Sequence, residues 1–116
     1  MGETIFSKII RKEIPAHIVY ETDEVLAFKD INPQAPVHVI IIPKITEIET
    51  TRDIDPKKHT KLLGALYEAA NKIAKDMKVH ETGFRLVLNC GPDSGQEVYH
   101  LHMHLLGGRK MNWPPG

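Results

Sequence analysis

The chain has very little that could stabilise it covalently or anchor it in a membrane. Cys90 is the only cysteine among 116 residues, which excludes an internal disulfide and a zinc site built on paired thiolates. No apolar run approaches the roughly 20 residues that cross a bilayer. Phe6, Ile9 and Ile10 are interrupted by polar and charged residues, unlike the apolar core of a secretory signal. We therefore expect a reduced, cytoplasmic protein that does not bind membranes.

An excess of charge of one sign is also missing. The 15 lysines and arginines balance 15 aspartates and glutamates, so the formal net charge is zero with neutral histidines. Without a basic field there is no general attraction to nucleic acid, and phosphate recognition must come from local donors. The length of 116 residues is enough for one core. We therefore expect a single domain over residues 1–116 and no nucleic-acid partner.

The order of apolar and turn-forming segments predicts an α+β domain. Helices are expected over residues 4–12, with Thr4 as the N-cap, and from the Asp55-Pro56 pair to about residue 78. Strands are expected over residues 17–20, 25–29, 37–42, 83–89 and 99–106. The short links between the first strands favour antiparallel pairing. We expect one five-stranded, mainly antiparallel sheet with the two helices covering one face.

Histidine is concentrated near the end of the chain. Residues 99–106 read YHLHMHLL, so His100, His102 and His104 occupy every second position. Strand side chains alternate between faces, so a strand would place all three imidazoles on one face and the apolar residues between them on the other. A helix would spread the same rings over roughly 200°. A buried ring nitrogen needs a partner, so an all-imidazole face rarely serves packing alone.

Three interpretations of this histidine face stay open on residue pattern alone. One imidazole could be a nucleophile or base that its neighbours orient. Neutral ring nitrogens could instead bind zinc, or the face could simply be solvated. Three alternate positions on a strand place the outer Cα atoms roughly 13 Å apart, so all three rings converge poorly on one ion, although two of them with a distant ligand could bind it. We favour catalysis, and we expect neither a bound metal nor a cofactor.

Other residues could join this site. His38 lies alone in an apolar strand, where a histidine is more often a satisfied core residue, but a strand beside the histidine run would bring a fourth imidazole. Residues 91–97 read GPDSGQE, and their glycines could turn backbone N–H groups toward an anion, although a connecting loop is the simpler interpretation. Asp30 follows a strand and could accept hydrogen bonds from two ribose hydroxyls, although turn-forming aspartates are commoner.

The histidine run has the form His-φ-His-φ-His-φ-φ, where φ is apolar, and it resembles the signature of the histidine triad (HIT) superfamily of nucleotide hydrolases and transferases. The flanking segments are similar to the Hint branch, the histidine triad nucleotide-binding proteins. These segments are GQEVY before the run, GGR after it, TIFSKII, IPA, FKDI, PQAP with His38, and the ending WPPG. The resemblance extends over essentially the whole chain.

The resemblance implies a HIT-like fold in which the sheets of a homodimer join into one continuous sheet. It also implies hydrolysis of purine nucleoside phosphoramidates, such as adenosine 5′-phosphoramidate or AMP linked to a lysine amine, through a nucleotidyl-histidine intermediate. The ligands would be small molecules of the purine nucleoside monophosphate type. A nucleotide-binding interaction or regulatory module with incidental hydrolysis is the alternative. Dinucleotide hydrolysis and nucleotidyl transfer also occur in the superfamily.

The resemblance assigns roles by position. His102 would attack the α-phosphorus, His104 and His38 would bind the phosphate and shape the proton network, and His100 would hold His102 in place. The nucleotide-binding residues would be Asn89, Gly95, Gln96 and Glu97 for the phosphate, Asp30 for the ribose, Ile5, Phe6, Ile9, Phe28 and Ile31 for the base, and Trp113 reaching toward the partner subunit. Glu97, counted here with the catalytic residues, replaces a serine of many Hint proteins that is thought to help protonate the leaving amine. Whether its side chain does so is left open.

Overall fold

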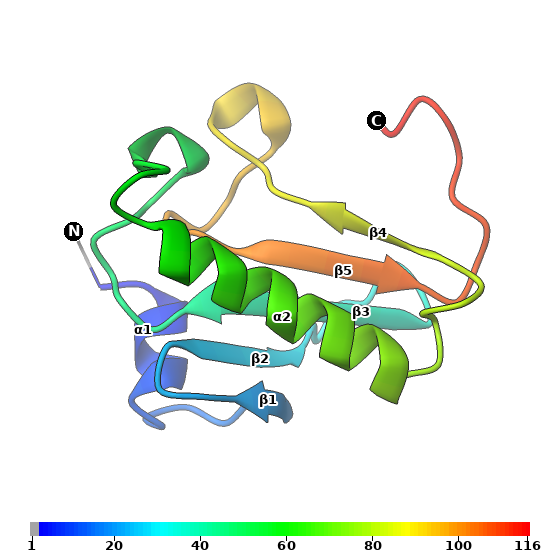
Figure 1. Cartoon of the computed structure of the whole chain (residues 1–116), viewed down its shortest axis with the longest axis horizontal. Helices are drawn as coiled ribbons and strands as arrows, with labels where there is room; N and C mark the ends of the chain where they lie inside the picture. Colours follow the sequence, from blue (N-terminus) through cyan, green and yellow to red (C-terminus); the bar gives the residue numbers. More distant parts are fainter. Residues whose placement is uncertain (1–2) are drawn as a thin grey trace.

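A computed structural model describes residues 3–116, which contain one five-stranded sheet and two α-helices (Figure 1). The elements are α1 (Ile5–Ile10), β1 (Ile18–Glu21), β2 (Val25–Lys29), β3 (Val37–Pro43), α2 (Thr60–Asp76), β4 (Phe84–Val87) and β5 (Met103–Gly107), with short 3₁₀ turns at Thr51–Asp53 and Pro92–Ser94. The sheet order is β1-β2-β3-β5-β4, and every neighbouring pair is antiparallel. The predicted α+β class and five-stranded antiparallel sheet are confirmed.

The two helices cover opposite faces of the sheet, so the expectation that both lie on one face is wrong. The reason is that β2 and β3 are apolar at consecutive positions and therefore need cover on both faces. One apolar layer joins α2 to Val25, Ala27, Val39 and Ile41, and the other joins α1 to Leu26, Phe28, Ile40 and Ile42. In Figure 1, α2 crosses in front of the sheet and α1 lies at one end of it.

The helix starts follow local capping chemistry. Thr4 caps α1 as predicted, because its hydroxyl accepts from Ser7 N–H at 3.2 Å. The predicted start of α2 at Asp55-Pro56 is wrong, since the helix begins at Thr60. The Asp55 carboxylate accepts from Lys57 N–H at 3.0 Å and so closes a separate turn before the helix. No helix in residues 3–116 has the length and apolarity needed to cross a bilayer.

The histidine strand is shorter than its alternating pattern predicts. The expected strand over residues 99–106 begins only at Met103. The register of β3 against β5 places Leu101 level with Pro43, which has no N–H to continue the ladder. Leu101 N–H donates instead to Ile48 O, at 2.9 Å. Two of the three histidines therefore lie just before β5 and are held by other contacts.

Candidate active site

The three histidines keep a common orientation although only His104 lies within β5. The apolar residues between them, Leu101, Met103 and Leu105, are buried in the layer under α2, as the alternation predicts. On the other side, the ring of Phe6 packs edge-on against His100 and His102, with centroids 5.9 and 5.1 Å apart. The His102 and His104 rings are 5.0 Å apart. Side-chain packing therefore maintains the alternation where the strand ladder is absent.

His102 is held through its inner ring nitrogen. Its Nδ1 lies 2.8 Å from His100 O, and His100 Nε2 lies 2.8 Å from Pro43 O. A carbonyl oxygen can only accept a hydrogen bond, so the proton of neutral His102 is on Nδ1. Nε2 consequently carries an unprotonated lone pair. His102, which lines the pocket described below, is thus arranged to act as a nucleophile or a base.

A second chain of hydrogen bonds determines the tautomer of His104. The N–H of Gln34 donates to His38 Nδ1 at 3.0 Å, so the proton of neutral His38 is on Nε2. That nitrogen lies 2.9 Å from His104 Nδ1 and 3.3 Å from Asp30 Oδ2. When His38 donates to His104 Nδ1, the His104 proton is on Nε2. His102 then presents a lone pair and its neighbour His104 presents an N–H donor.

All four imidazoles have pKa values below that of an exposed histidine. Burial is the main cause at each, and Asp30 opposes it at His38, His102 and His104. The pKa of His104 falls to about 4, because burial is reinforced by the neighbouring His102 and His38 rings. The site is therefore expected to be neutral near pH 7, the state that leaves a lone pair on His102.

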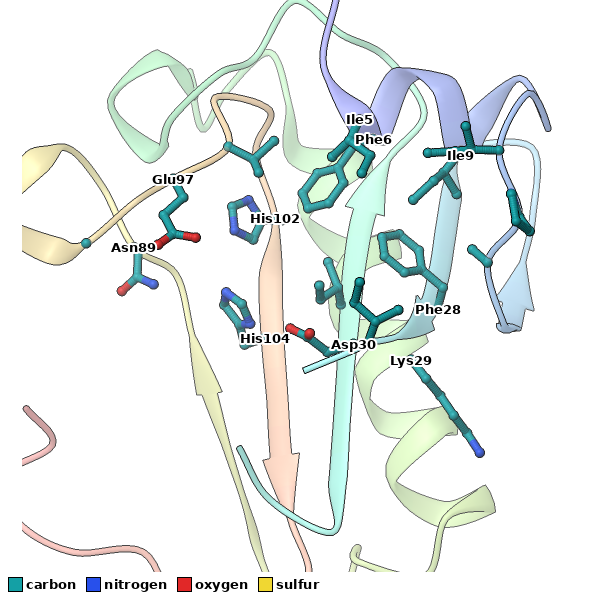
Figure 2. A pocket seen from close by; sticks show the side chains of 17 residues that line it. Ile5, Phe6, Ile9, Phe28, Lys29, Asp30, Asn89, Glu97, His102 and His104 are labelled. Atoms are coloured by element: carbon teal, nitrogen blue, oxygen red, sulfur yellow. The ribbon is translucent and has the colours of Figure 1, made fainter. Parts of the chain in front are cut away.

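His102 and His104 border a pocket of about 450 Å³ between α1, β2 and the loop before β5. Figure 2 shows Phe6, Ile9 and Phe28 on one side and Asn89 and Glu97 on the other, with His102 and His104 between them. An apolar wall suits a flat aromatic base, and the polar side suits a charged group. The pocket can therefore bind a molecule with one apolar end and one anionic end.

Most residues predicted to bind a nucleotide line this pocket. These are Ile5, Phe6, Ile9, Phe28, Asp30, Ile31, Asn89, Gly95, Glu97, His102 and His104. Four other predicted site residues do not line it: His38 and His100 are buried beside it, Gln96 is buried, and Trp113 is 81% exposed. Sequence reasoning did not assign Ile14, Pro15, Ala16, Lys29, Ile40 and Val98 to the pocket, which they also line. The segment around Pro15 lies far from β5 in sequence, so no local pattern indicates its contribution.

The loop before β5 offers fewer backbone donors than its glycines suggest. Gly95 N–H donates to Pro92 O at 3.0 Å, and Gln96 N–H donates to Gly91 O at 3.3 Å. Of the three predicted amide donors at residues 95–97, only that of Glu97 has no backbone acceptor within the described chain. The loop can therefore present one backbone N–H, beside the exposed Glu97 side chain.

One group of side chains in the described residues has the composition of a metal site. Single ligand atoms of Asp30, His38 and His104 all lie within 4.8 Å of one another. Two imidazoles and a carboxylate are ligands that zinc accepts. The group does not include His100 or His102, which fits the expectation that the three histidines of the run do not converge on one ion. An ion here would displace the proton between His38 and His104.

Comparison with known proteins finds one family of similar sequences and structures over nearly the whole chain. Residues 11–111 match the HIT domain model. A purine nucleoside phosphoramidase of Escherichia coli (strain K12) is 54% identical over 109 residues, which cover 94% of this chain and 90% of that protein. A 14 kDa zinc-binding protein of Zea mays is 54% identical over 113 residues, covering 97% and 88%. The crystal structure of a HIT family hydrolase from Legionella pneumophila Philadelphia 1 has a TM-score of 0.94 and 48% identity, covering 98% of this chain and 100% of that one. The expected HIT-like fold is confirmed.

We expect the free energy of unfolding to fall as the pH decreases from about 6.5 to about 4. The four imidazoles have lower pKa values in the folded chain than the ordinary 6.5, so the unfolded chain binds more protons in this window. For His104 alone the loss is on the order of 1–3 kcal/mol. Urea unfolding at several pH values between about 7.5 and about 4.5 measures this dependence of the free energy of unfolding on pH. His104→Asn should weaken the dependence, and the surface control His80→Asn should leave it unchanged. A free energy of unfolding that does not change with pH in the wild type would contradict the burial argument.

Proposed function

This chain belongs to the HIT domain family, and we propose that it hydrolyses the P–N bond of purine nucleoside phosphoramidates. The observation that carries this proposal is the pairing of a neutral His102, with its lone pair on Nε2, and an N–H donor on the adjacent His104. A phosphoryl group needs both a nucleophile and a donor to its oxygens. The named hydrolases among the relatives support the same class of reaction.

The two sides of the pocket supply a binding mode for the substrate. The purine would lie against Phe6, Ile9 and Phe28, which present aromatic and aliphatic surface. Asp30 lies between this wall and the histidines, and its carboxylate keeps free lone pairs for the ribose hydroxyls although Oδ1 accepts from Asn32 N–H at 2.8 Å. The α-phosphate would then lie in front of His102 and His104.

The reaction follows as two displacements at phosphorus. First, His102 Nε2 attacks the α-phosphorus, the P–N bond of the substrate breaks, and the amine leaves with a proton from an acid in the pocket, the role tested below for Glu97. Second, water attacks the nucleotidyl-histidine, the P–Nε2 bond breaks, the nucleoside monophosphate departs, and the proton lost by the water restores that acid. His104 Nε2–H and the Glu97 backbone N–H would donate to the phosphoryl oxygens in both steps. His100 O orients the His102 ring throughout by accepting from Nδ1.

A homodimer is part of the proposal. The strands β1 and β4 are the two edges of the sheet, and each has unpaired ladder groups on its outer side. Joining the sheets of two copies along the β4 edge would satisfy the groups on that edge. The C-terminal segment lies beside β4, because Arg85 donates to Asn112 O at 3.1 Å, so the exposed Trp113 would then lie near the partner subunit. Sedimentation equilibrium tests this point, since a purely monomeric protein would exclude it.

His102→Ala should lower phosphoramidate turnover by more than about 10³-fold, because the nucleophile is removed. Wild-type protein quenched with denaturant during turnover should carry a nucleotidyl group on His102, detected by peptide mass. Binding of AMP should persist in the variant, which separates loss of chemistry from loss of the pocket. His80→Ala is the matched surface control. Turnover that survives in His102→Ala, or an adduct on another residue, would refute the assignment.

Glu97→Gln tests whether this carboxyl group protonates the leaving amine. The Glu97 side chain points into the pocket beside His102 and Asn89 (Figure 2). A general acid contributes typically about 10²–10⁴-fold when the leaving group is a poor one. We expect that loss for alkylamine leaving groups and little loss for a phenol of low pKa. Equal slowing of both substrates would reject the role, and Glu81→Gln on the surface is the control.

Zinc binding is a second candidate function, favoured by the Asp30, His38 and His104 group and by a zinc-binding relative. Equilibrium dialysis of zinc against wild-type protein, His38→Asn and the surface control His80→Asn tests it. Zinc retained by wild type and lost in His38→Asn would establish a site. We expect phosphoramidate turnover to be unchanged after chelation, because neither displacement uses a metal. Turnover that is lost on chelation and restored by zinc would replace the mechanism above.

A further inference from the structure

The side chain of Gln96 is fully engaged by the protein's own backbone. Its Oε1 accepts from Gly91 N–H at 2.9 Å, and its Nε2 donates to Glu49 O at 3.0 Å and to Val98 O at 3.1 Å. The residue is only 7% exposed and does not line the pocket. A carboxamide has two N–H donors, and both are used here. Gln96 therefore cannot donate to a phosphate without breaking one of these two hydrogen bonds.

One of these bonds, together with two other contacts, joins the loop before β5 to the segment that follows β3. Glu49 O accepts from Gln96 Nε2 at 3.0 Å, and Ile48 O accepts from Leu101 N–H at 2.9 Å. Nearer to β3, the carbonyl of Pro43 lies 2.8 Å from the ring of His100. Residues 43–49 thus present three carbonyl oxygens to residues 96–101. None of the three acceptor residues lines the pocket.

We propose that Gln96 is a positioning residue for the phosphoryl-transfer site, an inference that rests on the function proposed above. Its carboxamide holds Gly91 and Val98 on either side of Glu97, the residue that presents both the free backbone N–H and the carboxyl group. The bond to Glu49 fixes the loop relative to the body of the protein. Gln96 acts on the reaction through Glu97 and touches no substrate atom.

Gln96→Glu is the sharpest test, because it keeps the shape of the side chain while it removes the two donors and adds a negative charge. A carboxylate at this position would face two carbonyl oxygens and would displace the loop. Displacement of reacting groups by about 1 Å can cost about 10²-fold in rate, so we expect kcat to fall by about 10–100-fold. The Kd for AMP should stay within about threefold, because the apolar wall on α1 and β2 is untouched. Asn71→Asp, an amide-to-carboxylate change on the outer face of α2, is the matched control.

Each outcome of this test bears on a different statement. A kcat equal to that of wild type, or a loss shared by Asn71→Asp, would overturn the positioning role. A large increase in the Kd for AMP with little change in kcat would show instead that Gln96 contacts the ligand. Inactive wild-type protein in the same assay would refute the proposed function itself. Hydrogen exchange in wild-type protein tests the bridge independently of variant folding, since an unprotected Gly91 amide would mean that Oε1 does not hold it.

Discussion

The hydrogen bond between His102 Nδ1 and the carbonyl of His100 is the constraint on which the site depends. It determines which nitrogen of His102 carries the proton, and it holds the ring in one orientation with Nε2 unprotonated. The carbonyl is itself fixed, because the His100 ring bonds to Pro43 O and packs against Phe6. If this arrangement were lost, a buried imidazole would still be present, but its lone pair would have no fixed direction toward a substrate.

One face of the sheet forms the main apolar core, and the other face also forms the pocket. The larger of the two clusters of buried apolar residues lies under α2, whereas the cluster under α1 is shared between packing and the pocket. Phe6 illustrates the sharing, since it packs against Phe28 and His102 and also lines the pocket wall. Placing neutral histidines on this side favours a nucleophile near pH 7 and makes the fold sensitive to acid, because both effects follow from the same desolvation.

Hydrogen bonds give two chemically identical side chains different roles: His104 presents a donor to the pocket and His102 presents a lone pair. Gln34 N–H acts on His38, and His38 acts on His104, so the donor facing the pocket is determined by a backbone amide at the far end of the chain of bonds. The carbonyl of His100 has the opposite effect on His102, because it accepts from Nδ1–H and leaves Nε2 without a proton. Two imidazoles with centroids 5.0 Å apart therefore differ in chemistry, because a backbone carbonyl holds the inner nitrogen of His102, whereas the inner nitrogen of His104 contacts His38 Nε2.

The sequence by itself determined the features that depend on short-range periodicity and capping. The alternation of His100, His102 and His104 with apolar residues, the cap at Thr4 and the antiparallel pairing of strands joined by short links are of this kind. Only the tertiary structure decided features that depend on contacts between distant segments. Pro43 stops the ladder opposite Leu101, and the side chain of Gln96 donates to the carbonyl of Glu49, a residue 47 positions away. A local pattern states which residues can share a face, but it does not state which backbone group from elsewhere will satisfy them, and here that pairing decides the chemistry.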